Sequence, residues 1–238
     1  MEKLVHKSET RGKSNLGWLD SKHTFSFGSY QNEERINFGA LRVINDDHVA
    51  PGMGFGTHPH RDMEIISIPL EGDLEHKDSM GNKGIIKEGD IQVMSAGKGI
   101  THSEFNSNND KPVKFLQIWV IPNKTNVEPR YQQLSLESLK KENDFYQILS
   151  PYEKDEGVWI HQNAWFHIGD LKRNESYSYE VKDKSNGLYV FVISGKIETE
   201  QELLENRDGM GIKGKDTLTF KSLEESKVLL MEVPLKLY

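Results

Sequence analysis

The sequence predicts an all-β protein built from two similar barrels. Short segments rich in β-branched and aromatic residues recur along the chain, and clusters of Gly, Asn, Asp and Pro separate them, which is typical of a β-sandwich or barrel. A weak internal repeat is the second observation. The segment EIISIPLEGDLEH (64–76) is echoed by LYVFVISGKIETE (188–200), and EGDIQVMSAG (88–97) by RDGMGIKGKD (207–216). Two barrels joined near residues 122–150 explain this repeat better than one irregular sheet.

The clearest predicted strands cover residues 36–44, 63–72, 113–121, 187–195 and 227–235. Helix is scarce, and the best candidate is 135–143, where Ser135 is placed to cap and Leu136 and Leu139 share a face. We therefore divide the chain into a first barrel (1–122), a linker with a short helix (123–150) and a second barrel (151–238).

Composition excludes several classes of function. The 238 residues include no cysteine, so disulfides, Cys-based zinc sites and a thiol nucleophile are excluded and any metal must be bound by His, Asp or Glu. A net charge of −7 without a Lys/Arg-rich block argues against nucleic-acid binding. The polar opening and the lack of a long apolar run indicate neither a signal peptide nor a membrane span, so we expect a cytoplasmic protein.

A His-Pro-His motif precedes the apolar strand at 63–72. Residues two apart on a strand point to the same face, so His58, His60 and Glu64 are expected to share the face of Ile66 and Ile68. We expect that face to line the barrel interior. Pro59 lacks an N–H and therefore predicts a strand start or an edge strand.

A second pair of candidate ligands follows a Gly-rich turn about forty residues later. His102 and Glu104 have the same parity and should lie side by side on one strand. Three imidazoles and one carboxylate suit a divalent ion, and a six-coordinate ion would keep up to two positions open for substrate, O₂ or water. The pattern therefore indicates a catalytic site more than a closed structural one.

The stretch from 58 to 106 and the segment LQIWVIP (116–122) resemble the pirin family of the cupin superfamily. The segments 11–28 and 160–171 resemble bacterial pirin-like proteins in particular. The resemblance implies a bicupin of two jelly-roll barrels in which the metal ligands are His58, His60, His102 and Glu104. In most cupins the glutamate of the first motif, here Glu64, is the carboxylate ligand. We follow the pirin pattern and expect Glu64 to orient an imidazole or the substrate.

The second barrel serves as an internal control for the ligand set. Aligning the repeats places Val181 and Asp183 opposite His58 and His60, and Phe220 and Ser222 opposite His102 and Glu104. Since no ligand set survives there, we expect one divalent metal ion per chain and a metal-free second barrel with a packing role.

The resemblance implies a metal-dependent dioxygenase of the quercetin 2,3-dioxygenase type, acting with O₂ on a flavonol or a similar planar aromatic enol. Glu104 is the expected catalytic base for the substrate hydroxyl. Fe²⁺ is our first choice of metal, although Mn²⁺, Co²⁺, Ni²⁺, Cu²⁺ and Zn²⁺ also suit the ligands. The alternatives are a regulatory protein-binding module and a cupin isomerase or hydrolase. O₂ consumption and a partner pull-down separate them, and a monomer is the working expectation.

The remaining histidines and aromatic residues are expected to be ordinary core or surface groups. The residues concerned are His23, His76, His161, His167, Phe25, Phe27, Phe38 and Phe55.

Overall fold

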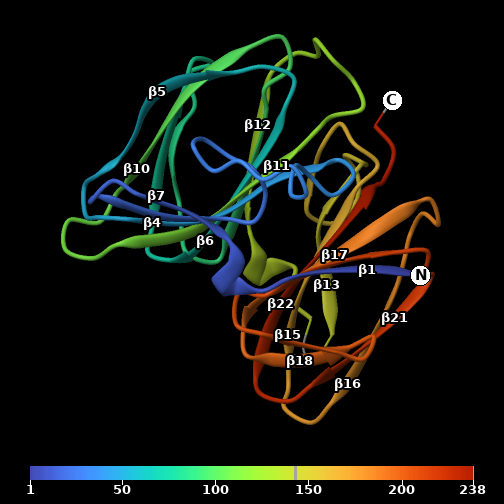
Figure 1. Cartoon of the computed structure of the whole chain (residues 1–238). Coiled ribbons are helices and arrows are strands. Elements are labelled where there is room, and N and C mark those ends of the chain that lie inside the picture. The colour runs from blue at the N-terminus through green and yellow to red at the C-terminus, as the bar shows by residue number, and fades with distance from the viewer. Residues whose placement is uncertain (142–143, 238) are drawn as a thin grey trace.

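The computed structural model describes residues 1–141 and 144–237 and consists almost entirely of β-strands. Figure 1 shows two barrels, one formed by the first half of the chain and one by the second. Each barrel has a seven-stranded and a four-stranded sheet. Nearly all strand pairs are antiparallel, and β13 with β14 form a parallel pair. This confirms the predicted two-barrel, all-β cupin fold.

The first barrel is formed by a large sheet and a small sheet. In hydrogen-bonding order the large sheet contains β12 (Arg130–Ser135), β9 (Asp90–Ser95), β6 (Glu64–Glu71), β11 (Val113–Val120), β4 (Leu41–Val49), β3 (Leu19–His23) and β2 (Gly12–Asn15). The small sheet contains β5 (Gly54–His60), β10 (Ile100–Asn106), β7 (Leu74–Asp78) and β8 (Lys83–Ile86). The edge position of β5 agrees with the presence of Pro59 in this strand.

The second barrel repeats this arrangement. Its large sheet contains β1 (Glu2–His6), β20 (Gly209–Lys213), β17 (Asn186–Ser194), β22 (Ser226–Pro234), β15 (Trp165–Leu171), β13 (Phe145–Ser150) and β14 (Val158–Trp159). Its small sheet contains β16 (Ser176–Glu180), β21 (Thr217–Ser222), β18 (Lys196–Thr199) and β19 (Glu202–Glu205).

Helical structure in the described residues is limited to two 3-10 turns, η1 (Ser8–Thr10) and η2 (Leu136–Ser138). The N–H of Glu137 donates to the Ser135 hydroxyl, so the predicted cap is confirmed, but the helix predicted for 135–143 is a single turn. Positions 142 and 143 of that prediction lie outside the described residues. No helix in the described part of the chain is long and apolar enough to cross a membrane.

Three strands belong to sheets that the division of the chain at residues 122 and 150 does not suggest. Strand β1 starts the chain yet lies among the strands of the second barrel (Figure 1), where it pairs with β20. Strands β12 and β13 both come from the expected linker, and they pair with β9 of the first barrel and β15 of the second. Sheet pairing therefore crosses both borders of the linker, and the division itself stays a prediction.

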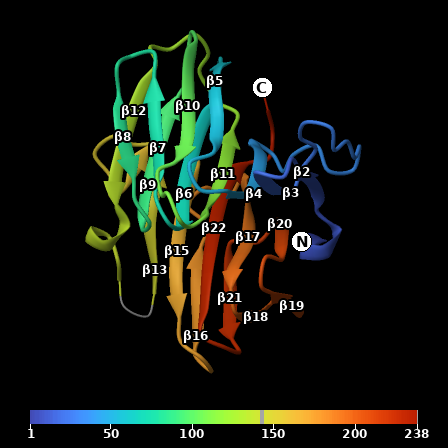
Figure 2. The same cartoon turned by 90° about the vertical axis from the view of Figure 1, so that its left-hand side faces the viewer.

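The largest apolar core lies between the two seven-stranded sheets, where the barrels meet (Figure 2). Ile66 and Ile68 from the first barrel belong to this core, together with Phe166 and Phe191 from the second. The expectation that Ile66 and Ile68 line the barrel interior is wrong. The sheet is covered on both faces, so β6 is apolar on both and its parity does not identify the inner face.

The interiors of the two barrels differ in chemistry. A single cluster of apolar and tyrosine side chains fills the second barrel and includes Val181 and Phe220, two of the positions aligned with metal ligands. The first barrel has two smaller apolar clusters, one around Phe115 and one around Met94. The space between these two clusters is lined by polar side chains, among them candidate metal ligands.

Candidate metal centre

The candidate ligands lie on adjacent strands of the small sheet in the first barrel. Strand β10 is hydrogen-bonded to β5 on one side and β7 on the other, and His102 lies directly opposite His58. The ring centroids of His58, His60 and His102 are 4.4 to 4.9 Å apart. The structure thus places together the three histidines that the sequence predicts.

A β-bulge in β5 positions these side chains. His102 pairs with His58, but Glu104 pairs with Phe55, so β5 has one extra residue between the two pairs. The bulge re-aims the strand, and both His58 and Phe55 face the interior although their spacing is odd. Gly54 allows the close approach, because a Cβ there would lie 2.2 Å from the carbonyl oxygen of Glu104.

Two overlapping groups of potential ligands share His102. The ligand atoms of His58, His60 and His102 lie within 4.8 Å of one another, and so do those of His76, His102 and Glu104. These are the groups of three or more metal-binding side chains found among residues 1–141 and 144–237. His76 was expected to be an ordinary core residue, but its ring lies 5.4 Å from that of His102.

The protonation of the histidines suits a metal. His58 Nδ1 lies 2.8 Å from the carbonyl oxygen of Gly56, which assigns the proton to Nδ1 and leaves Nε2 for a ligand. Burial, reinforced by neighbouring histidines, lowers the pKa of His60 to about 4 and that of His102 to about 3. Metals bind the neutral form, which both residues have at pH 7.

His102 tests whether the residues fit a metal. The residue is 2% exposed, and neither ring nitrogen has a hydrogen-bond partner within residues 1–141 and 144–237. An unpaired buried polar atom costs about 1–3 kcal/mol, and coordination would satisfy one nitrogen. A divalent ion therefore fits this donor set.

Hydrogen bonds hold Glu104 in place beside the histidines. One carboxylate oxygen accepts from the Ser67 hydroxyl at 3.0 Å, and the other accepts from the Gln117 amide at 2.8 Å. Ser67 and Gln117 lie opposite each other on β6 and β11. The large sheet thus orients a carboxylate that belongs to the small sheet.

Glu64 lies outside this group. Its carboxylate accepts from the Ser95 hydroxyl at 2.7 Å, and Glu64 precedes the strand residues that face the second barrel. Burial raises its pKa to about 7, against the opposing effects of Ser95 and Arg130. Glu64 does not share the face of His58 and His60, because the chain leaves the small sheet after His60 and enters the large sheet at Glu64. Its expected role in orienting an imidazole is not supported by these contacts.

A half-enclosed cavity of about 320 Å³ adjoins the candidate ligands. His58, Glu104 and Gln117 form part of its wall. Apolar wall residues are Leu16, Leu19, Phe27, Phe55 and Trp119, and the polar ones include Ser14, Ser21, His23, Asn45 and Asp47. The Trp119 ring also packs edge-on against His60, 5.0 Å between centroids.

Several cavity residues were assigned to the core from the sequence. Phe25 and Phe38 do pack in the core between the barrels, as expected. Phe27 lines the cavity, and Phe55 both lines the cavity and packs against the apolar cluster around Phe115. His23 lines the cavity as well. The sequence did contain a signal for His76, because Leu74, His76 and Asp78 alternate along one strand and therefore share a face. In the structure His76 pairs directly with Glu104.

Comparison with known proteins identifies the family. The family model described as Pirin matches residues 4–120, and the Quercetinase C-terminal cupin domain matches residues 147–233. The chain is 37% identical over 230 residues to a quercetin 2,3-dioxygenase from Escherichia coli, covering 97% of this chain and 98% of the relative. The chain belongs to the pirin family. This pirin is also 37% identical to a pirin-like protein from Caulobacter vibrioides, over 93% of this chain and 95% of that one.

Solved structures agree with this assignment. The crystal structure of YhhW from Escherichia coli superposes with a TM-score of 0.94 at 36% identity, covering the whole of both chains. The same bacterial pirin in complex with nickel(II) gives a TM-score of 0.92 at 36% identity, covering 98% of this chain and 99% of that one. A relative with this fold therefore binds a divalent metal.

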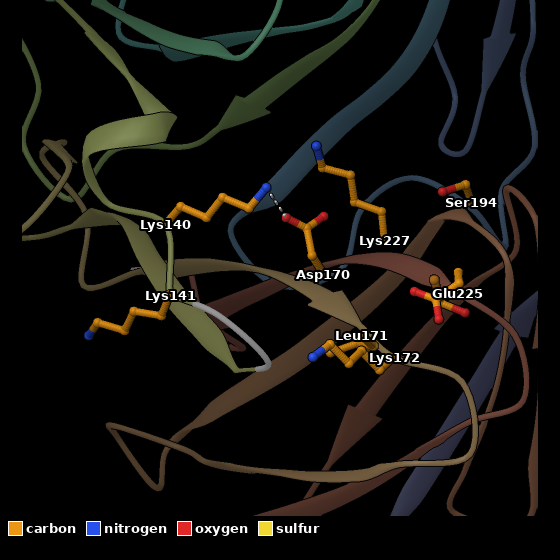
Figure 3. A pocket seen from close by; sticks show the side chains of 9 residues that line it. Lys140, Lys141, Asp170, Leu171, Lys172, Ser194, Glu225 and Lys227 are labelled. Atoms are coloured by element: carbon orange, nitrogen blue, oxygen red, sulfur yellow. Dashed lines mark ion pairs between the residues drawn. The ribbon is translucent and has the colours of Figure 1, made fainter.

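A separate open groove of about 440 Å³ is lined largely by charged side chains (Figure 3). Lys140 and Asp170 form an ion pair of 3.3 Å across it, as the dashed line shows. Its lining residues include none of the candidate ligands. The candidate metal centre of this pirin is therefore separate from this groove.

Proposed function

We propose that this pirin is a metal-dependent dioxygenase of the quercetin 2,3-dioxygenase type, which acts on a flavonol or a similar planar enol. The observation that carries the proposal is a cavity whose wall includes both His58 and Glu104. Its volume, about 320 Å³, falls in the range of roughly 300–1,000 Å³ typical of small-molecule sites. The name of the Escherichia coli relative supports the same reaction.

The proposed metal ligands are His58, His60, His102 and Glu104, supported by the two ligand triads. A divalent ion bound there would act as a Lewis acid on the enol hydroxyl and offer a binding position for O₂. The identity of the metal, with Fe²⁺ as our first choice, is part of the proposal. The complex of the related YhhW with nickel(II) supports a site that is not restricted to iron.

Glu104 is the proposed base. Its carboxylate borders the cavity, and hydrogen bonds from Ser67 and Gln117 fix the direction of both oxygens. Taking the enol proton would require one of these bonds to lengthen or exchange, which a hydroxyl donor such as Ser67 allows because Gln117 is a second acceptor for it at 3.2 Å. A positioned carboxylate base contributes typically ~10²–10⁴-fold in rate.

The aromatic wall supports a planar substrate. Phe27, Phe55 and Trp119 line the cavity with ring surfaces, which pack well against another ring system. The indole N–H of Trp119 is buried without a partner among the described residues.

The test is O₂ consumption by protein reconstituted with one divalent metal at a time, with quercetin as substrate. We expect O₂ uptake coupled to loss of quercetin, and none with a His58→Ala, His60→Ala double variant. Loss of quercetin that continues under argon would instead indicate a Lewis-acid isomerase or hydrolase. Absence of both, with every metal, would contradict an enzymatic role and favour the regulatory alternative.

A further inference from the structure

A polar face of the large sheet forms the cavity wall contributed by β3 and β4. Ser21, His23, Asn45 and Asp47 lie there, and each is at most 4% exposed. They form two cross-strand pairs, Ser21 with Asp47 and His23 with Asn45. Four buried polar side chains on a cavity wall need hydrogen-bond partners, and a ligand is one source.

Most of these groups are satisfied within the protein. His23 Nδ1 lies 2.8 Å from the Asn45 side-chain oxygen, and its Nε2 lies 2.9 Å from the Ser14 hydroxyl. Asp47 is different, because its side chain lines the cavity while its buried Oδ1 has no hydrogen-bond partner among the described residues. Burial raises the pKa of Asp47 to about 7, with a hydrogen bond to Ser21 opposing the shift.

Asp47 has no role in the ion pairs that join the two barrels. That role belongs to Asp46, which lies 2.9 Å from Arg207 of the second barrel and 3.4 Å from Arg11. Successive side chains on a strand point to opposite faces, so Asp46 faces the arginines and Asp47 faces the cavity. A carboxyl group that could be paired with arginine is instead held unpaired beside the substrate site.

We propose that Asp47 is a specificity-determining residue, whose carboxyl group accepts a hydrogen bond from a substrate hydroxyl remote from the enol that meets the metal. The substrate class is then a polyhydroxylated planar aromatic enol, and a bare flavonol ring is a poor ligand. This inference rests on the proposed function. A site built to bind a hydroxyl rejects analogues that lack it, because the buried acceptor is then left unpaired.

Equilibrium binding tests the inference without turnover. Metal-loaded protein is titrated under argon with quercetin and with 3-hydroxyflavone, which retains the enol but lacks the other hydroxyls. Quenching of tryptophan fluorescence reports binding, since Trp119 lines the cavity. We expect wild-type protein to bind quercetin about 10–100-fold more tightly than 3-hydroxyflavone, because the ligand without the hydroxyl leaves a buried acceptor unpaired.

Asp47→Ala should reduce the ratio of the affinities for quercetin and 3-hydroxyflavone to within about threefold of unity, chiefly by weakening the binding of quercetin. Asp47→Asn should give an intermediate ratio. The matched control is Asp46→Asn, which removes the neighbouring carboxylate on the other face and should keep the wild-type ratio. The inference would be overturned if Asp47→Ala kept the wild-type ratio, which includes an equal loss of affinity for both ligands. If Asp47→Ala does not fold, Asp47→Asn decides.

The wild-type titration separates this inference from the proposed function. Equal affinity for the two ligands contradicts the role of Asp47 and leaves the dioxygenase proposal standing. Binding of neither ligand contradicts both.

Discussion

Replacement of Glu104 by glutamine separates the two roles proposed for this residue, as a metal ligand and as the base that accepts the enol proton. Glu104 is 3% exposed and accepts one hydrogen bond on each oxygen, from Ser67 and from Gln117. Glutamine keeps the shape and one acceptor oxygen, while its NH₂ group faces a former donor. The Ser67 hydroxyl can turn to its second acceptor on Gln117 at 3.2 Å, so the network loses about one hydrogen bond, or ~1–3 kcal/mol.

The expected effects on metal and on activity therefore differ in size. Metal affinity should fall by about 10–100-fold, as for a weakened contact in a metal site. Quercetin-dependent O₂ uptake at saturating metal should fall further, by roughly 10²–10⁴-fold, because a glutamine side chain cannot accept the enol proton. An oxygen electrode and a competitive chelator titration measure the two quantities on the same preparation.

Glu64→Gln is the matched control. Glu64 accepts from Ser95 and belongs to the interface between the barrels, so its replacement should leave metal affinity and O₂ uptake within about threefold of wild type. The reasoning is refuted if Glu64→Gln strips the metal while Glu104→Gln keeps full metal and full activity. That result would show that the carboxylate ligand follows the general cupin pattern.

Three further outcomes are expected. Elemental analysis should find one tightly bound divalent ion per chain, and His102→Ala should remove it while the circular dichroism spectrum stays β-rich, because apolar clusters flank the site; two ions, or unfolding, would contradict this. The carboxyl group of Glu64 has a pKa of about 7 in the folded protein, against an ordinary value of 4.5. Its burial therefore costs no stability below pH 4.5, where the group is protonated in both states, and the folded state loses stability as the pH rises through 7. Glu64→Gln should thus raise the free energy of unfolding at pH 8 by on the order of 3 kcal/mol relative to wild type, and by little at pH 4.5; an equal change at both values would contradict the shift. Phe166→Ala, in the core between the barrels, should cost about 3–5 kcal/mol in urea denaturation, and a cost below about 1 kcal/mol would show that the barrels do not depend on each other.

The fold could be predicted from the sequence because its signals are local. Apolar segments, Gly-rich turns and the echo between the two halves give two barrels, and Pro59 identifies an edge strand. The pairing of β1 with the second barrel has no local signal. A short polar strand can pair with any free edge, and which edge it meets depends on the long-range path of the chain.

The candidate ligands could be predicted because both motifs keep the parity of a continuous strand. Glu64 was misplaced because the chain changes sheets between His60 and Glu64. Phe55 was assigned to the core as an aromatic residue, and its place on the cavity wall depends on the bulge in β5, which inverts parity within a single strand. Asp47 could not be found from the sequence, since its neighbour Asp46 is chemically identical and only the fold decides which one faces the cavity.

The central claim is that one divalent ion binds to His58, His60, His102 and Glu104. Crystals soaked in Ni²⁺ and measured at the nickel absorption edge test it directly, through the anomalous difference map. We predict a single strong peak per chain, about 2.0–2.2 Å from a nitrogen of each histidine and from a Glu104 oxygen, as for first-row metals with such ligands. A peak bound by His76 without His58 and His60, or a peak in the second barrel, would contradict the account.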